Sequence, residues 1–519
     1  MTRDELVGRL AGRFDVLVVG GGATGLGTAV DALLRGYRTA LVEASDFAKA
    51  TSSRSSKLVH GGVRYLRSGQ IGLVREALHE RAILRRNAAH LVDELGFICP
   101  LYRRFEGPYY FAGFKLYDLL AGKANFHASA YLGRAQTLDR LPDLKRAGLH
   151  GSIRYYDGQF DDARLALALA RTALDLGGAV LNYARAERLL YEGERVCGAL
   201  VREAESGREF ELRAKVVVNA TGIFADELRA LDDASAKPLL SRSRGAHVVF
   251  PKAAFRGSDA LLVPETDDGR VLFLIPWKDH VVFGTTDVPV ARSELEPAPT
   301  RAEVDFIIAQ ANNLLQKPVG RGYALAAYAG LRPLVSGAAA STAKLSREHV
   351  IEVAKSGLVT ICGGKWTTYR KMAQDTVDAA AREGKLAAAP SRSALLSLHG
   401  NPGLNAAASG GPYAIYGSDA GELSALEASD PALRERIHPR LPYTHAEVVY
   451  AAREELARTV DDVLARRTRA LLLDAEAARE AAPAVAALLA LELGRDGEWQ
   501  AQQLADFGRI AAANLAPIR

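Results

Sequence analysis

The spacing of apolar residues differs between three parts of the chain. Near the start, the β-branched runs Asp15 to Val19 and Thr39 to Val42 flank a helix-like segment, which predicts a strand, helix and strand in succession. From Ser241 to Val290, alternating apolar runs are broken by Gly, Pro and Asp, which predicts an antiparallel sheet. After about residue 388, capping-box sequences at Thr444 and Thr459 predict helices. We therefore expect an α/β part, an antiparallel part and a helical part.

A glycine motif stands between the first strand and the first helix. Gly20, Gly22 and Gly25 have the G-x-G-x-x-G spacing, which lets the backbone turn sharply and approach a pyrophosphate at the helix N-terminus. Glu43 ends the second strand, 18 residues after the last glycine, where it can accept hydrogen bonds from a ribose. Glycines also occur in such turns for packing reasons alone. The strand, helix and acidic residue in register favour a Rossmann-type dinucleotide site.

Composition and charge exclude several classes of protein. The chain is 48% hydrophobic and 24% charged, as in folded globular proteins. A net charge of +5 suits an anionic substrate or an anionic lipid surface, and it is too small to indicate nucleic acid. Cys99, Cys197 and Cys362 lack metal-ligand spacing, so we expect reduced thiols and no metal site. No apolar stretch reaches the length of a membrane-spanning helix.

The residues after Glu43 distinguish FAD from NAD. The stretch from Thr51 to Leu66, TSSRSSKLVHGGVRYL, resembles the signature of FAD-dependent glycerol-3-phosphate dehydrogenases, within the glycine oxidase and D-amino-acid oxidase group of flavoproteins. The resemblance implies that FAD is the cofactor. The alternative is that the serines only cap a helix and Lys57 is solvated.

Three further motifs resemble this family. His247 lies in RGAHVVF, Arg332 in YAGLRPL, and Lys365 in VTICGGKWTTYRK, where a helix N-terminus is expected to face the flavin and favour negative charge on it. A lone histidine at a strand is also compatible with a satisfied core residue, and the two cations with surface charges. The resemblance implies instead that the three residues are catalytic and bind substrate, and that Arg64 and Tyr65 help to bind a phosphate.

The cofactor-binding residues implied by the glycine motif and the resemblance come from six segments. They are Gly20, Gly22, Ala23, Thr24, Gly25, Glu43, Ser52, Ser53, Lys57, His60, Gly61, Gly62, Ala186, Ala220, Thr221, Gly222, Gly364, Lys365 and Thr367.

The resemblance implies oxidation of sn-glycerol 3-phosphate to dihydroxyacetone phosphate by hydride transfer to FAD, with electrons passed to a membrane quinone. A neutral imidazole such as His247 is the natural base for the hydroxyl proton. Three alternatives stay open: an α-glycerophosphate oxidase that reduces O2 to H2O2, an amino-acid or sarcosine oxidase of the same fold, and a flavin-binding module without turnover. We expect a cytoplasmic protein bound peripherally to the inner membrane, and a homodimer is left open.

An aromatic segment from Leu101 to Lys123 interleaves tyrosine and phenylalanine with arginine and lysine. This pattern is typical of a patch that faces lipid headgroups or a quinone tail, and it also fits a domain core with a solvated rim. Before it, Ile71 to Glu94 is predicted as one helix.

The expected fold class is α/β, and α+β overall, in three domains. Residues 14–70, 150–240 and 330–385 are assigned to a discontinuous Rossmann-type FAD-binding domain, and 71–149 and 241–329 to a substrate-covering domain with an antiparallel sheet. Residues 386–440, partly rich in Ala, Ser, Gly and Pro, are predicted as a linker, and 441–519 as a C-terminal helical domain.

Two groups of charged residues are assigned structural roles. Asp161 and Asp162 precede a helix rich in Ala and Leu, where carboxylates cap free N–H groups. Arg466, Arg467 and Arg469 are expected on a solvated or domain-contacting face.

Overall fold

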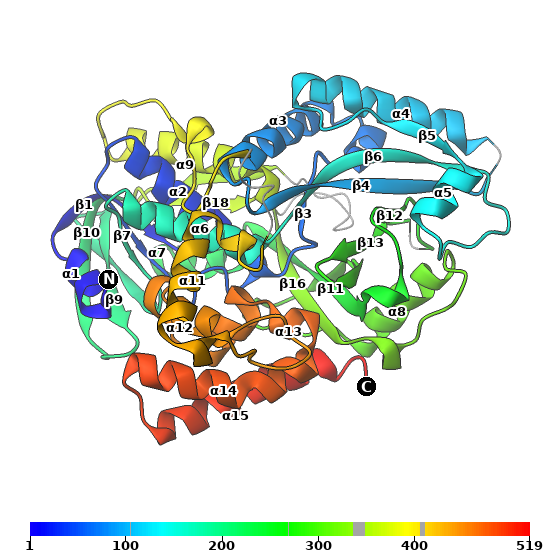
Figure 1. Ribbon diagram of the computed structural model, residues 1–519. Helices are drawn as coiled ribbons and strands as arrows, with labels where there is room; N and C mark the ends of the chain where they lie inside the picture. The colour runs from blue at the N-terminus through cyan, green and yellow to red at the C-terminus, as the bar shows by residue number, and fades with distance from the viewer. Residues whose placement is uncertain (104, 268, 336–347, 405–410) are drawn as a thin grey trace.

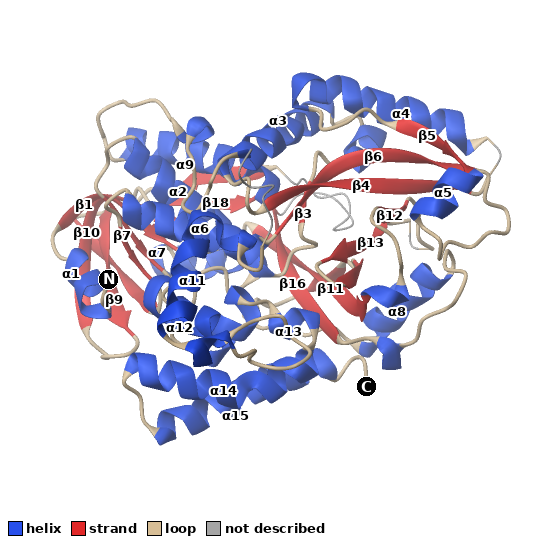
Figure 2. Cartoon of the chain, in the orientation of Figure 1, coloured by secondary structure: helices blue, strands red, loops and turns tan. Residues whose placement is uncertain are grey.

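The computed structural model covers residues 1–519 and describes all of them except 104, 268, 336–347 and 405–410. For Arg64, Arg67 and Ser68 only the backbone is described. Two sheets lie side by side, each with helices on its outside, and a layer of C-terminal helices runs beneath both (Figures 1 and 2). The predicted mixed α/β class, with a C-terminal helical part, is confirmed.

The first sheet has a parallel centre. Its main strand order is β17-β18-β10-β1-β2-β7, and β1 pairs in parallel with both β10 and β2. The described strands are β1 (Arg13–Val19), β2 (Thr39–Val42), β7 (Ala179–Leu181), β8 (Ala184–Glu192), β9 (Arg195–Glu203), β10 (Glu209–Asn219), β17 (His349–Val353) and β18 (Val359–Gly363). Val16, Val18 and Leu41 are fully buried, because helices cover this part of the sheet on its faces.

Helices connect and cover these strands. They are α1 (Arg3–Arg9), α2 (Ala23–Leu34), α6 (Asp162–Asp175), α7 (Ala225–Asp232) and α9 (Tyr369–Glu383). The predicted unit of strand, glycine turn, helix and second strand is present as β1, α2 and β2.

The second sheet is mainly antiparallel, as the alternation between Ser241 and Val290 predicted. Strand β11 pairs antiparallel with β14, β15 and β16, whereas β12 and β4 pair in parallel. The strands are β3 (Leu58–Val59), β4 (Val92–Leu101), β5 (Ala130–Gly133), β6 (Gly151–Phe160), β11 (Leu240–Pro251), β12 (Ala260–Val263), β13 (Leu272–Trp277), β14 (His280–Gly284), β15 (Val288–Val290) and β16 (Ala326–Val335). Helices α3 (Ile71–Asn87), α4 (Glu106–Ala121), α5 (Arg134–Arg140) and α8 (Arg301–Asn312) pack around it.

Two boundaries differ from the expectation. The helix expected from Ile71 to Glu94 ends at Asn87, because Val92 to Leu101 pair residue by residue with β6. Strands β3 and β6 and the part of β16 from residue 330 onward, assigned to the FAD-binding domain, belong to the second sheet. The two parts therefore exchange strands more often than the sequence indicated.

The segment 386–440, expected as a linker, contains helix α11 (Ala420–Ser429) and short 3-10 helices at Ser393–Leu395, Ala414–Asp419 and Pro431–Arg434. Tyr413, Tyr416 and Leu423 form a buried cluster with Tyr450. Burial of these aromatic side chains stabilises the segment, which a tally of Ala, Ser and Gly does not reveal.

The C-terminal helices are α12 (His445–Glu454), a π-helix (Asp462–Arg467), α13 (Ala470–Leu473), α14 (Ala475–Leu493) and α15 (Gly497–Leu515). The predicted capping box is present at Thr444 and Glu447. Helices α13 and α15 contact β16, and the α14–α15 pair runs beneath both sheets (Figure 1). The C-terminal helices thereby pack against the second sheet at β16 and extend beneath the first (Figure 1).

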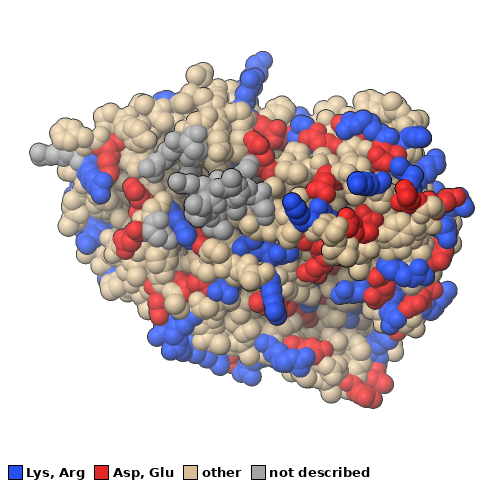
Figure 3. Space-filling model, turned by 180° about the vertical axis from the view of Figure 1, so that it is seen from behind, with Lys and Arg blue, Asp and Glu red and all other residues tan. Residues whose placement is uncertain are grey.

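The net charge of +5 is not gathered on the face of the molecule seen from behind. There, Lys and Arg side chains lie interspersed with Asp and Glu (Figure 3). Within the described ranges, no helix is long and apolar enough to cross a membrane.

Candidate active site

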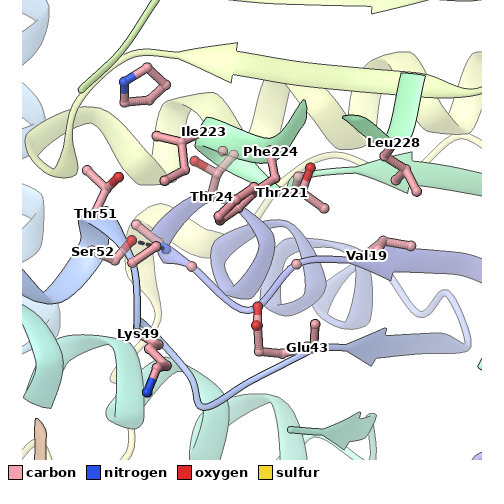
Figure 4. A pocket seen from close by; sticks show the side chains of 18 of the residues that line it. Val19, Thr24, Glu43, Lys49, Thr51, Ser52, Thr221, Ile223, Phe224 and Leu228 are labelled. Carbon is pink, nitrogen blue, oxygen red and sulfur yellow. Dashed lines mark hydrogen bonds between the residues drawn. The ribbon is translucent and has the colours of Figure 1, made fainter. Parts of the chain in front are cut away.

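A first cavity of about 650 Å³ lies at the carboxyl ends of β1, β2 and β10. This is where parallel sheets bind ligands, because the strand ends and the following helix N-termini meet there. Figure 4 shows Val19 and Glu43 at the tips of their strands, with Thr24, Thr221 and Phe224 nearby.

The glycine turn has room for no side chain at two positions. Gly20 has a φ of +113°, and a Cβ there would lie 2.5 Å from the carbonyl oxygen of Ala220. A Cβ on Gly25 would lie 1.9 Å from the carbonyl oxygen of Gly20. Helix α2 therefore starts directly above β1, and the N–H of Ala23 donates to Ser52 Oγ at 3.0 Å. The free N–H groups at such a helix start suit a phosphate.

Glu43 shapes the other side of this cavity. Its carboxylate accepts hydrogen bonds from the N–H of Gly21 at 2.6 Å and from that of Ser45 at 2.8 Å. Burial raises the pKa of this carboxyl. The two donors fix the carboxylate at the end of β2, where the sequence placed a ribose ligand.

The first cavity gathers twelve of the predicted cofactor residues. They are Gly20, Gly22, Ala23, Thr24, Glu43, Ser52, Ala186, Ala220, Thr221, Gly222, Gly364 and Lys365. It also includes Lys49, Arg185, Phe224 and Met372, which belong to none of the motifs used, and Trp366, which stands inside the VTICGGKWTTYRK motif but was not selected as a site residue.

The other predicted cofactor residues lie elsewhere. Gly25 packs behind the turn, and His60 and Gly62 line a second cavity. The N–H of Gly61 donates to Asp157, and the N–H of His60 donates to Thr367 Oγ1 at 3.1 Å. Ser53 is buried, and its carbonyl accepts from Lys57.

Lys57 differs most from its predicted role. Its side chain is fully buried, and Nζ donates to Asp162 at 2.7 Å and to the carbonyl of Ser53 at 2.7 Å. Burial and the nearby Arg469 lower the pKa of Lys57 to about 7. A positive φ of 61° turns this lysine into the protein, so it supports the loop from behind. Asp161 caps α6 as predicted, by accepting from the N–H of Arg164, and Asp162 accepts from the N–H of Ala163 at 2.9 Å. Asp162 is in addition the ion-pair partner of Lys57.

The second cavity has a volume of about 510 Å³ and lies between the loop that carries Ser56 and His60, the second sheet and α4. Most of its wall is aromatic or aliphatic, with Phe97, Tyr109, Tyr110, Phe114, Tyr155 and Phe273 among the lining residues. Its polar groups include Ser56, His60, Arg270, Asp287 and Arg332. An apolar cavity with a few polar groups is typical of small-molecule sites.

Two arginines in the wall of this cavity donate hydrogen bonds to the same turn, Thr286–Asp287. Arg332 donates through Nη2 to the carbonyl of Thr286 at 3.0 Å and through Nη1 to Asp287 Oδ1 at 3.3 Å. Arg270 donates through Nη1 to the carbonyl of Asp287 at 2.6 Å. Arg270 was missed because it stands in a loop with no recognised motif. Two guanidinium groups beside one carboxylate make this wall suitable for an anion.

His247 lies behind Ser56. Its Nε2 is 2.8 Å from Ser56 Oγ, and its ring stacks on Tyr328 with centroids 4.7 Å apart. Burial, together with the charges of Lys57 and Arg332, holds the pKa of His247 well below its ordinary value. The imidazole is therefore neutral at pH 7. It does not line the second cavity itself, but it contacts the hydroxyl of Ser56, which does.

Lys365 and Tyr65 stand where the two cavities approach each other. Lys365 lines the first cavity, Tyr65 lines the second, and Lys365 Nζ lies 4.0 Å from the centroid of the Tyr65 ring. The backbone of Arg64 lies beside Tyr65, and its side chain is outside the described part of the structure. The larger first cavity and the smaller second cavity thus approach each other at this contact.

Comparison with known proteins gives consistent matches. A family model described as FAD dependent oxidoreductase matches residues 15–370, and one described as the C-terminal domain of alpha-glycerophosphate oxidase matches residues 356–502. Glycerol-3-phosphate dehydrogenase 2 of Mycobacterium bovis is 43% identical over 524 residues, covering 98% of this chain and 88% of that protein. The mitochondrial glycerol-3-phosphate dehydrogenase of Homo sapiens is 42% identical over 525 residues, covering 95% and 72%.

A solved structure is similar along nearly the whole chain. The X-ray structure of the glycerol-3-phosphate dehydrogenase from Bacillus halodurans complexed with FAD has a TM-score of 0.81 and 28% identity, and the match covers 99% of this chain and 98% of that one.

Proposed function

Since the chain belongs to the family of FAD-dependent glycerol-3-phosphate dehydrogenases, we propose that it oxidises sn-glycerol 3-phosphate to dihydroxyacetone phosphate and passes the electrons to a membrane quinone. One observation carries this proposal. The second cavity is lined by Ser56, Arg270 and Arg332, and the neutral His247 lies directly behind Ser56. This cavity approaches the first one at Lys365.

The first cavity fits the cofactor, FAD. Gly20 and Gly25 leave space for close backbone approach, the start of α2 offers N–H groups to a pyrophosphate, and Glu43 is held at the end of β2 as a ribose acceptor. When bound, FAD supplies the hydride acceptor. Lys365, at the boundary between the cavities, places a positive charge where negative charge develops.

The second cavity supplies the substrate site. Arg332 and Arg270 offer guanidinium forks to the phosphate, which binds such groups in bidentate fashion. Their hydrogen bonds to the Thr286–Asp287 turn fix both side chains before substrate arrives. Tyr65 lines the same cavity, and Arg64, beside it in the chain, is proposed as a further phosphate ligand.

Ser56 and His247 together are proposed to remove the proton from the C2 hydroxyl of sn-glycerol 3-phosphate. Ser56 Oγ faces the cavity and is 2.8 Å from His247 Nε2. We propose that Ser56 takes the hydroxyl proton as it gives its own proton to Nε2. The imidazole can accept this proton because burial keeps it neutral. Tyr328 stacks on the ring and holds its orientation.

Helix α4 supports the proposed membrane and quinone partners. Four apolar side chains are exposed along one face, Phe105, Tyr109, Leu116 and Leu119, with exposed fractions of 90%, 63%, 38% and 75%. We call these four residues the α4 face. Lys115 and Lys123 are also exposed on or next to this helix, and cations there suit anionic headgroups.

Two residues of the α4 face, Tyr109 and Leu116, also line the second cavity. A quinone dissolved in the bilayer therefore has a short apolar route to the site where the electrons arise. The proposed location is the cytoplasmic surface of the inner membrane, with α4 turned toward the lipid.

The second candidate is an α-glycerophosphate oxidase, which shares flavin and substrate and passes the electrons to O2. The family model that matches residues 356–502 carries that enzyme's name, which favours this alternative. The α4 face favours the quinone.

The decisive experiment follows the flavin absorbance without oxygen. Addition of sn-glycerol 3-phosphate to the purified protein should bleach the flavin, and a soluble quinone should restore the colour faster than oxygen does. Rapid recovery in oxygen with formation of H2O2 would establish the oxidase. An unbleached flavin would reject the proposed substrate.

A further inference from the structure

Arg469, from the C-terminal helices, makes direct contact with the loop of residues 51–57. Its side chain is fully buried, and Nη2 donates to the carbonyl of Ser53 at 2.6 Å and to Asp162 Oδ1 at 2.8 Å. Arg469 follows the π-helix and stands before α13, whereas Ser53 lies near the start of the chain. The C-terminal part thus holds a loop of the cofactor-binding part.

Lys57 duplicates these contacts from inside the loop. Its Nζ also donates to the carbonyl of Ser53, at 2.7 Å, and to both oxygens of Asp162. Lys57 and Arg469 both have left-handed backbones, with φ of 61° and 70°. Such conformations cost energy in residues other than glycine and persist where surrounding contacts enforce them, often at functional sites.

Asp162 is the common partner. Besides the two cations, it accepts hydrogen bonds from the N–H of Ser55 at 3.0 Å and from Ser55 Oγ at 2.7 Å. The loop is thereby fixed at Ser53, Ser55 and Lys57 around one buried carboxylate.

The same loop reaches both cavities. Ser52 Oγ accepts the hydrogen bond from Ala23 at the start of α2, inside the first cavity. Ser56 Oγ lies 2.8 Å from His247 Nε2 at the second cavity. A shift of the loop would therefore move a cofactor contact and the proposed proton relay together.

We infer that Arg469 is a positioning residue, which acts through Ser53 and Asp162 to hold Ser52 at the FAD site and Ser56 against His247. The C-terminal domain thus completes the active site without lining either cavity in the described part of the chain. The role at Ser56 rests on the proposed function, whereas the role at Ser52 concerns FAD binding alone.

The first test measures FAD binding and needs no turnover. In Arg469→Gln, Asp162 keeps Lys57 as a counter-charge, so we expect a folded protein. The FAD dissociation constant, measured by flavin fluorescence on the apoprotein, should rise about tenfold, because one hydrogen bond from a charged donor to the loop is lost. Arg469→Lys should recover part of this loss. Ser52→Ala should weaken FAD binding without adding to the effect of Arg469→Gln, because both changes act on the same contact.

The second test measures kcat and KM for sn-glycerol 3-phosphate. Arg469→Gln should lower kcat about tenfold at saturating FAD and leave KM within twofold, since the phosphate arginines belong to another wall. Ser56→Ala combined with Arg469→Gln should lower kcat little further than either change alone. Additive losses in both cycles would mean that Arg469 only stabilises the fold, and the inference would be wrong.

The Arg164–Glu455 pair provides a matched control. The pair is buried and also joins α6 to the C-terminal part, with Arg164 Nη2 2.6 Å from Glu455 Oε1. Unlike Arg469, however, Arg164 directs its side chain to Glu455 and to the ring of Tyr416. Replacing both partners with glutamine removes the pair without leaving a lone charge. FAD affinity and kcat should stay within twofold; a loss equal to that of Arg469→Gln would contradict a specific role for Arg469.

Ser55→Ala covers the case in which Arg469→Gln does not fold. It removes the hydroxyl bond to Asp162 and leaves both cations in place. FAD affinity should fall in the same direction, and unchanged affinity would overturn the inference. If the wild-type flavin is not bleached by substrate, the proposed function fails while the FAD measurements still decide this role of Arg469.

Discussion

Arg332 and Pro333 are neighbours in β16, yet Arg332 lines the second cavity and Pro333 lines the first. Successive side chains of a strand point to opposite sides, so one strand contributes to both walls. The separation of the two cavities at this point thus follows from the two-residue period of a strand.

Arg332→Lys should therefore impair substrate binding and leave FAD binding intact. Lysine keeps the charge but loses the fork that a phosphate accepts, so KM for sn-glycerol 3-phosphate should rise at least about tenfold. Arg270→Lys should act in the same direction. Steady-state kinetics give KM, and flavin fluorescence gives FAD affinity; an unchanged KM in both variants would remove this wall from the phosphate site.

Gly20→Ala should abolish tight FAD binding. The new Cβ would meet the carbonyl of Ala220 at 2.5 Å in a backbone with φ of +113°. Gly36→Ala is the matched control, because Gly36 also has a positive φ, +84°, but open space around it. Both variants should lose roughly 1 kcal/mol of stability from backbone strain. Only Gly20→Ala should purify without yellow colour; equal FAD content in the two would refute the tight turn as the cause.

His247→Gln should lower the rate of flavin bleaching by about 10² to 10⁴ with little change in KM, as expected for loss of a general base. Ser56→Ala should have a smaller effect, about tenfold, since it removes the relay and keeps the imidazole. Stopped-flow absorbance without oxygen measures the step directly. A full bleaching rate in Ser56→Ala would exclude the serine relay, and a full rate in His247→Gln would exclude the base.

Leu119→Glu should detach the protein from lipid vesicles that contain anionic lipid. A charge on the α4 face opposes burial in the interface, and vesicle flotation measures the loss. Leu491→Glu on α14 is the control, since Leu491 is exposed to a similar extent, 78% against 75%. Bleaching by substrate should be normal in both variants. Equal flotation of the two would argue against α4 as the lipid-binding helix.

His399 should make stability depend on pH. Its Nδ1 lies 2.6 Å from Asp175 and its Nε2 lies 2.9 Å from Asp419. Burial opposes the charged ring, but the hydrogen bonds to Asp419 and Asp175 outweigh it and raise the pKa of His399. The folded state therefore binds this proton more tightly than the unfolded state does.

The resulting stabilisation is fully present below about pH 6.5, the ordinary pKa of histidine, and is lost as pH rises through the raised value. His399→Gln should lower the calorimetric midpoint by about 1 °C at pH 6 and have no effect at pH 9, because partly exposed pairs contribute at most about 1 kcal/mol. His79→Gln, at an exposed position of α3, is the control. An effect of His399→Gln that is equal at both pH values would exclude the charged bridge.

The sequence predicted the parts of the site that depend on local geometry. Gly20, Gly25 and Glu43 belong to a turn whose shape is set by neighbouring residues, so their spacing alone was informative. The role of Lys57 depends instead on Asp162, 105 positions later, and on a backbone angle that a polar run does not reveal. Arg270 was missed for a related reason, since its place at the cavity results from the pairing of β12 with β13.

The fold shows the same division. The alternation after Ser241 marked the antiparallel sheet correctly, because period two is a local property of strands. The segment 386–440 was expected as a linker since its composition is mostly small and polar. Tyr413 and Tyr416 are ordered by contact with Tyr450, which no local pattern could indicate.

Ser53 and Arg469 are 416 residues apart in the chain. A ribosome that adds about 5 to 20 residues per second needs roughly 20 to 80 s to make the intervening stretch. For that time the loop beside the glycine turn exists without its C-terminal partner. We therefore expect newly made chains to load FAD late, once synthesis is complete, and truncated chains to accumulate as colourless protein even though they contain the whole glycine motif.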